Sequence, residues 1–158
     1  MSFLSSFDIC ASGLSAQRVR MDIAAENIAN IETTRTEGGG SYTRKLVTFE
    51  SYGEESFQEA LRNAAHGKGY TTNTRTGVRV SAIVEDDREF KRVYNPEHPD
   101  ADENGYVNIP NVDLLKETVD SMSATRSYEA NVTALNAIKA MAQKALESRR
   151  LSGLRKTR

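Results

Sequence analysis

The sequence is poor in the residues that build a large core or mark a reactive centre. Among its 158 residues there is no Trp, one Cys and three Pro, and 38% are hydrophobic. The single cysteine, Cys10, has no partner for a disulfide within the chain, and because it lies in an apolar row we interpret it as a small buried hydrophobe. The mean hydropathy is -0.57. Much of the chain is therefore expected to be solvated or covered by partners.

Long apolar runs and an excess of one charge are missing as well. No segment approaches the roughly 20 apolar residues that cross a bilayer, which argues against membrane insertion. Residues 1–8 carry neither a basic region nor an apolar run, so no cleaved signal peptide is expected. The 21 basic and 22 acidic residues give a net charge of -1. A charge this small provides no overall field that would recruit nucleic acid.

Motifs that carry chemistry are weak or incomplete. His66 and His98 stand apart in loop-like sequence, and the glycines at 38–40 follow a polar linker instead of a strand. Residues 100–105 match the first half of an EF-hand calcium loop, but its twelfth position is Asn111 where a glutamate is required. We interpret this segment as a polar turn, with weak calcium binding as the alternative. The sequence thus predicts no enzyme, no cofactor and no metal centre.

Two long heptad stripes occupy the ends of the chain. From Phe3 to Ile31, and again from Ala124 to Ala145, mainly apolar residues recur in alternating steps of four and three. A period of 3.5 residues keeps one narrow seam facing a partner helix along its whole length. We therefore expect the two terminal segments to form long helices that pair as a coiled-coil-like domain.

The helix limits follow from local signals. The first helix is expected from Phe3 to about Asn30, where β-branched residues and glycines break the pattern. The second is expected to begin after Asp113, which can cap it, and to end near Glu147. In its first turns the seam is expected to be marked by three apolar residues before it shifts at Ala124: Leu115, Val119 and Met122.

The middle of the chain reads as strands. Segments 42–49, 78–84, 90–94 and 105–107 are rich in β-branched and aromatic residues. Between them, 56–65 is expected to be a short helix or a mobile insertion, and 66–77 a loop. The fold class is α+β, with a small β-rich module inserted between paired terminal helices. The expected domains are 1–36 (helix and linker), 37–110 (central module with an insertion at about 51–77), 111–147 (helix) and 148–158 (basic tail).

The basic tail at 148–158 is expected to be disordered. Its arginines and lysine could contact nucleic acid or lipid headgroups, but short basic tails are more often solubilising ends, and no aromatic residue is interleaved for stacking.

Two amides interrupt the seams. Gln17 lies in the middle of the first stripe and Asn131 in the second. A buried amide in such a seam costs stability and can fix the register, because a slipped pairing leaves it unsatisfied. The alternative is that each amide faces a wet gap between helices.

Several motifs resemble the bacterial flagellar axial proteins, which include rod and hook components. The N-terminal part of the resemblance lies in residues 14–18, in Asn27-Ile28-Ala29-Asn30, and in Thr33-Thr34. Residues 93–112 and 127–132 resemble more closely the proximal rod proteins of that family. The resemblance covers most of residues 1–147; the stretch 51–77 and the tail depart from it.

This resemblance implies a structural role. Such subunits are exported unfolded through the flagellar type III apparatus without a cleaved signal peptide. In the rod that crosses the periplasm, they assemble with copies of themselves and with other proximal rod, distal rod and rod-base adaptor proteins. The resulting hollow drive shaft transmits motor torque and encloses the export channel, with the terminal helices forming its inner tube.

The expected assembly interface consists of seam and motif residues: Phe3, Phe7, Leu14, Gln17, Met21, Asn27, Ile28, Asn30, Tyr128, Asn131, Leu135, Ile138 and Ala142. Two alternatives remain open from the sequence. One is a hook or distal-rod subunit, and the other is a self-contained coiled-coil adaptor or chaperone.

Overall fold

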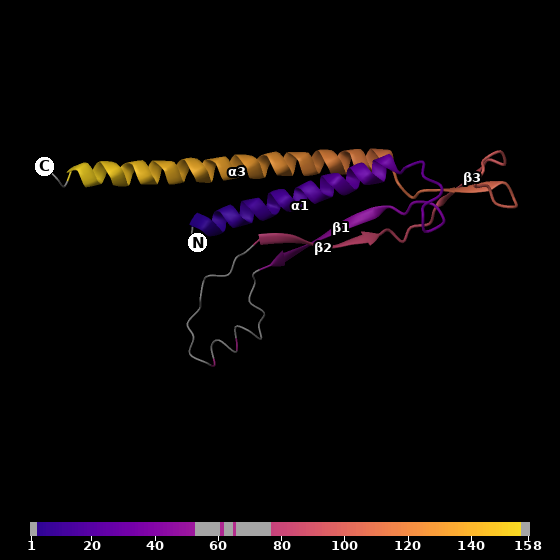
Figure 1. Cartoon of the computed structure of the whole chain (residues 1–158), viewed down its shortest axis with the longest axis horizontal. Helices are drawn as coiled ribbons and strands as arrows, with labels where there is room; N and C mark the ends of the chain where they lie inside the picture. Colours follow the sequence, from indigo (N-terminus) through magenta and orange to yellow (C-terminus); the bar gives the residue numbers. More distant parts are fainter. Residues whose placement is uncertain (1–2, 53–60, 62–64, 66–76, 156–158) are drawn as a thin grey trace. The chain divides into compact units, whose positions relative to one another are not determined.

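The computed structural model describes residues 3–52, 61, 65 and 77–155, with side chains described from residue 5 to residue 148. Its elements are two long helices, α1 (Phe3–Ala29) and α3 (Leu114–Arg155), and four strands, β1 (Lys45–Tyr52), β2 (Gly77–Glu85), β3 (Lys91–Tyr94) and β4 (Tyr106–Ile109) (Figure 1). The predicted α+β class is confirmed. The expected helix or insertion at 56–65 and the loop at 66–77 lie almost wholly outside the described residues.

Contacts divide the chain into two units. Unit 1 comprises residues 1–16, 50–79 and 127–158, and unit 2 comprises 17–49 and 80–126. Each unit contains part of α1 and part of α3, running antiparallel to one another. In unit 1, Gly13 lies against Asn131. In unit 2, Met21 accepts a hydrogen bond from Thr125, and Asn27 meets Glu117. The predicted helix pairing is thus present in both units.

The strands form two separate two-stranded sheets, β1–β2 and β3–β4. In the second sheet the strands are antiparallel, and Tyr94 stands opposite Tyr106 with their rings edge to face, 5.3 Å between centroids. Gly105, just before β4, has a φ of 78°. A side chain there would be strained and would meet the Tyr94 ring at 2.9 Å, so the tight turn requires glycine.

The loop before Gly105 is a polar turn, as the sequence predicts. Oδ1 of Asp102 accepts hydrogen bonds from the backbone N–H groups of Asn104 and Tyr106, at 2.9 and 2.8 Å. These bonds add to the backbone hydrogen bond from Gly105 N to Asp102 O, at 2.9 Å, that closes the turn. The EF-hand-like spacing at 100–105 is explained by this turn geometry.

Helix α3 begins where the sequence predicts. Oδ1 of Asp113 accepts a hydrogen bond from Leu115 N at 3.1 Å, which satisfies one of the free N–H groups at the helix start. The predicted end near Glu147 is wrong, because α3 continues to Arg155. The expected disorder of the tail is therefore also wrong for 148–155. This segment is dominated by Leu, Arg and Ser, and its one helix-weakening residue is Gly153.

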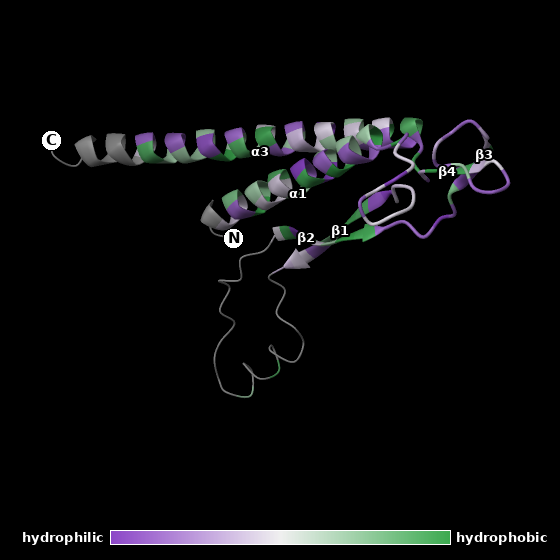
Figure 2. Ribbon diagram, turned by 45° about the vertical axis from the view of Figure 1, so that its right-hand side comes forward, coloured by the Kyte–Doolittle hydropathy of each residue, from purple (hydrophilic) through white to green (hydrophobic). Residues whose placement is uncertain are grey.

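The exposure pattern of α3 follows the predicted stripe from Ala124 onward. Ala124 is fully buried, and the half-buried positions after it recur at heptad spacing as far as Ala142. Figure 2 shows hydrophobic and hydrophilic residues alternating along this helix. Ala145, the last residue of the predicted stripe, is exposed.

The first turns of α3 differ from the prediction. Leu115, Val119 and Met122 are 78%, 66% and 55% exposed, whereas Glu117 is 1% exposed. Extending the heptad spacing back from Ala124 leads to Glu117 at seven residues, so helix geometry places the glutamate on the inner face. The assignment of the three apolar residues to the early seam between the two helices is wrong.

Candidate assembly site and its polar network

Where the end of α1 meets the start of α3, in unit 2, six polar side chains form a connected network. We call this network the polar node; its members are Asn27, Tyr42, Arg44, Asp86, Asn111 and Glu117. They come from α1, the segment before β1, the residue after β2, the segment before α3, and the start of α3 itself. Buried polar groups are stable only when they are hydrogen-bonded, so the node must be satisfied from within.

Asn27 is the centre of the node and is 1% exposed. Its Nδ2 donates to Lys45 O at 2.9 Å and to Glu117 Oε2 at 3.0 Å. Its Oδ1 accepts from the Tyr42 hydroxyl and from Lys45 N, both at 2.9 Å. The amide therefore uses its full hydrogen-bonding capacity and joins α1 to β1 and α3.

Glu117 is the buried charge of the node. Its Oε1 accepts from Arg44 Nε at 2.6 Å, and its other oxygen accepts from Asn27. The guanidinium of Arg44 also lies 3.3 Å from Asp86 Oδ2, so one cation bridges two carboxylates. A buried carboxylate is tolerated only with such pairing, because its desolvation costs several kcal/mol.

Asn111 connects the end of β2 to the segment before α3. Its Nδ2 donates to the carbonyls of Asp86 and Arg88, at 3.0 and 2.9 Å. Its Oδ1 accepts from Arg44 N at 2.8 Å. Arg88 also lies 2.5 Å from the Asp86 carboxylate. Hydrogen bonds from Arg88, reinforced by Arg44 and opposed by burial, hold the pKa of Asp86 well below its ordinary value.

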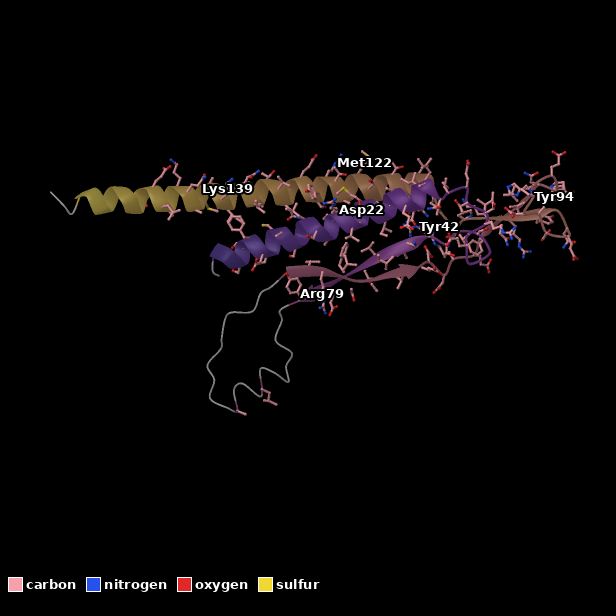
Figure 3. All side chains as sticks on the ribbon, in the orientation of Figure 1. Asp22, Tyr42, Arg79, Tyr94, Met122 and Lys139 are labelled. Atoms are coloured by element: carbon pink, nitrogen blue, oxygen red, sulfur yellow. The ribbon has the colours of Figure 1, made fainter. Side chains whose placement is uncertain are left out.

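Tyr42 is a node residue that lies in the segment before β1 (Figure 3). It is 7% exposed. Burial, together with the negative charges of Glu26 and Glu117, raises the pKa of its hydroxyl to about 12. The phenol is therefore neutral near pH 7 and donates a hydrogen bond to Oδ1 of Asn27.

The node explains why β1 starts later than the sequence predicts. The N–H groups of Arg44 and Lys45 are bonded to the side-chain amides of Asn111 and Asn27. Strand β1 therefore runs from Lys45 to Tyr52, whereas the prediction was 42–49. Tyr42 and Arg44 serve as node partners.

A hollow of about 370 Å³ lies beside the node in unit 2, lined by α1, β1 and the first turns of α3. Two of its lining residues, Arg20 and Asp120, form a bidentate ion pair, and the hydrogen bond to Asp120 raises the pKa of Arg20. Its wall is half apolar, with Ile23 and Phe49 among the lining residues. Within the described part of the chain, no three His, Cys, Asp or Glu side chains are grouped to hold a metal ion.

The predicted interface residues on α1 fall into two groups. Phe7, Leu14, Gln17, Met21 and Ile28 are half-buried along the seam, while the side chain of Phe3 lies outside the described residues. Oε1 of Gln17 is buried and meets no hydrogen-bond donor among the described residues.

The two motif asparagines have different roles. Asn27 centres the node, whereas Asn30 ends α1 by donating from Nδ2 to Glu26 O at 2.9 Å and accepting from Thr33 at 3.1 Å. Asn30 thus caps the C-terminal turn of the helix.

The predicted interface residues on α3 share one face. Tyr128, Asn131, Leu135, Ile138 and Ala142 are all half-buried, and most positions between them are exposed. The structure also shows a second apolar face on α3, which the sequence analysis had assigned to the seam. It consists of the exposed residues Leu115, Val119 and Met122, which we call the outer row. In Figure 3, Met122 lies on the edge of α3 that faces away from α1.

Comparison with known proteins agrees with this architecture. Residues 7–35 match the family described as flagella basal body rod protein, and residues 103–148 match the C-terminal family of the flagellar basal body rod FlgEFG proteins. The flagellar basal-body rod protein FlgC of Bacillus subtilis (strain 168) is 51% identical over 151 residues, which cover 93% of this chain and 98% of that protein.

The chain belongs to the FlgC family of flagellar basal-body rod proteins. The FlgC proteins of Borreliella burgdorferi and Salmonella typhimurium are 39% and 40% identical, each over 92% of this chain and 97% of their own length. The chain is accordingly a structural protein of the flagellar basal-body rod. This membership favours the predicted proximal-rod assignment over a hook subunit, a distal-rod subunit or a self-contained adaptor. No helix in the described part of the chain is both long and apolar enough to span a bilayer.

Proposed function

We propose that the chain self-assembles, together with homologous axial proteins, into the hollow proximal rod that transmits motor torque and encloses the export channel. In this proposal, the terminal helices α1 (Phe3–Ala29) and α3 (Leu114–Arg155) form the inner tube, and the central module at 37–110 faces outward. The partners are further copies of this chain, other proximal rod, distal rod and rod-base adaptor proteins, and the flagellar export apparatus. The rod crosses the periplasm, and each subunit reaches it by type III export without a cleaved signal.

One observation carries the proposal most directly. The outer row of α3 exposes three large apolar side chains at spacings of four and three, so they form a continuous stripe on one side of the helix. Scattered apolar residues on a surface are normal, but a stripe of this kind on a helix whose opposite face is already packed indicates a second packing partner. A neighbouring subunit supplies that partner in the rod.

The length of α3 supports a role in transmitting force. Its 42 residues extend over about 63 Å at about 1.5 Å per residue. Many such helices packed side by side resist twisting as one body, since each is held along two faces. Head-to-tail contacts, which join two different surfaces of identical subunits, produce an open helical shaft where the rotation does not close.

Folding and assembly are coupled in this mechanism. Ordering the backbone costs about 1–2 kcal/mol per residue, and the half-buried seam of α1 and α3 offsets only part of that cost. Contacts made by the predicted interface residues and by the outer row with neighbouring subunits supply further burial. Helix segments that are loosely held before assembly are also compatible with passage through a narrow export channel.

The proposal is tested by placing a charge on the outer row. Val119→Glu should prevent incorporation of the chain into basal bodies, because the carboxylate would be buried against a neighbour without a partner. Ala134→Glu is the control: it adds the same charge at an exposed position of α3 that lies 12 residues beyond Met122, the last residue of the row. The measurement is the amount of each variant in purified basal bodies and the swimming of the cells.

Circular dichroism of the purified variants verifies that both retain the wild-type helix content. Normal incorporation of Val119→Glu, at equal expression and with motile cells, would refute the role of this face in assembly.

A further inference from the structure

Helix α1 contains one glycine in its interior, Gly13. Glycine lowers the local helix-forming equilibrium about fivefold relative to alanine, so an interior glycine in an otherwise uninterrupted helix requires a structural reason. The chain around it gives no local reason: Gly13 lies ten residues after the start of α1 and has no positive φ.

The reason lies on α3. A Cβ at Gly13 would be 3.0 Å from Nδ2 of Asn131, 3.4 Å from its Cγ and 3.5 Å from its Oδ1. All three atoms of the amide group thus lie over the space that the missing side chain leaves. Contacts of 3.0 Å are tighter than almost all real Cβ contacts, so an alanine would force the amide to move.

Ser12, the residue before Gly13, contacts the start of β2. Oγ of Ser12 accepts a hydrogen bond from Val78 N at 3.2 Å, and a Cβ at Gly77 would lie 2.6 Å from that oxygen. These contacts lie within unit 1 and hold α1 close to the start of β2. Displacing α1 away from α3 to accommodate a larger residue 13 would therefore compress this second contact.

We propose that the space beside Gly13, which we call the notch, receives the amide of Asn131 and thereby fixes the axial register of α1 against α3 in unit 1. The seam residues adjacent to Asn131, Tyr128 and Leu135, are too large for the notch left by glycine. A slip by one helical turn, about 5.4 Å, would bring one of them over Gly13 and move the Asn131 amide to the side chain of Cys10 or Gln17, three or four residues along α1. Only one alignment places the small polar residue over the glycine.

The contact lies within one chain, so it does not rest on the proposed function. It also differs from the polar node, which joins α1 and α3 through Asn27 and Glu117 in unit 2. Each unit thus has its own specific contact between the two helices.

A double-mutant cycle tests the contact. Gly13→Ala, Asn131→Ala and the double variant are compared with the wild-type full-length chain by urea unfolding, followed by circular dichroism at 222 nm. Ala11→Gly, at an exposed position of α1, calibrates the effect of helix propensity alone. With Asn131 removed, Gly13→Ala should raise the folding equilibrium constant about fivefold, as propensity predicts.

With Asn131 present, this gain should be absent or reversed, since the added methyl meets the amide. The proposal stands if the two backgrounds differ fivefold or more, and equal gains in both overturn it. The register is measured separately, from the distance between spin labels at the exposed positions Asp8 and Asn136 in a Cys10→Ser background. Gly13→Ala should shift or broaden that distance relative to Ala11→Gly, and an unchanged, sharp distance would refute the register role.

Discussion

Glu117 provides the sharpest test of how the helices are held to the central module. The variant Glu117→Gln keeps the shape of the side chain but removes its charge and one acceptor oxygen. Its new NH2 group must face either Asn27 Nδ2 or Arg44 Nε, and both of these groups are donors. One of the two contacts therefore becomes donor against donor in a site that is 1% exposed.

The size of the effect follows from these contacts. Removing one partner of a buried ion pair typically costs about 3–5 kcal/mol. Arg44 retains Asp86 as a second partner at 3.3 Å, so the lower end, about 3 kcal/mol, is expected. For a small protein with a urea m-value of roughly 2 kcal/mol per molar, this loss lowers the unfolding midpoint by about 1.5 M. Such a loss is a large fraction of the total stability of a domain.

The assay is urea unfolding of the purified full-length chain at pH 7, and the control is Glu129→Gln. Glu129 lies on the same helix but is exposed, so its neutralisation should change the free energy of unfolding by no more than about 0.5 kcal/mol. If Glu117→Gln unfolds at the same urea concentration as Glu129→Gln, the buried pairing of Glu117 with Arg44 is not what stabilises unit 2.

Two further predictions concern the residues around the node. Asp113→Ala should destabilise the chain by about 1 kcal/mol through loss of the N-cap of α3, whereas Asp113→Asn, which can still cap, should cost much less; urea midpoints compare the two. The folded-state pKa of Asp86 is depressed, so its contribution to stability is fully present above its unfolded pKa of about 4 and is lost as the pH falls below that value. The difference in melting temperature between wild type and Asp86→Asn should therefore shrink between pH 5 and pH 3, and a pH-independent difference would contradict this assignment.

Local sequence was sufficient to predict the helices and most of the seam. A heptad repeat is visible in the residues themselves, because burial on a helix recurs every three or four positions. The start of α3 was predictable for the same reason, since Asp113 caps the helix from within two residues. The class of the middle region was predictable from its β-branched residues, although its division into two separate sheets was not.

The polar node could not be predicted, because its contacts join residues far apart in the chain. Glu117 lies 90 residues from Asn27 and 73 from Arg44. Hydropathy places a charged residue on the outer face and apolar residues inside, which is why the first turns of α3 were assigned with the wrong face inward. Only the heptad spacing indicated that Glu117 faces inward, since it stands seven residues before Ala124.

The node and the outer row together explain why a glutamate is buried while leucine, valine and methionine are exposed at the start of α3. A helix that packs on one side only would gain by exchanging them. Here the inner position joins α1 and the segment before β1, and a carboxylate can accept hydrogen bonds from Asn27 and Arg44 at once, which an apolar side chain cannot. The outer positions remain apolar because, in our proposal, a neighbouring subunit covers them. The apparent inversion of the hydrophobic pattern is therefore the expected arrangement for a helix that holds its own module with polar contacts and its neighbours with apolar ones.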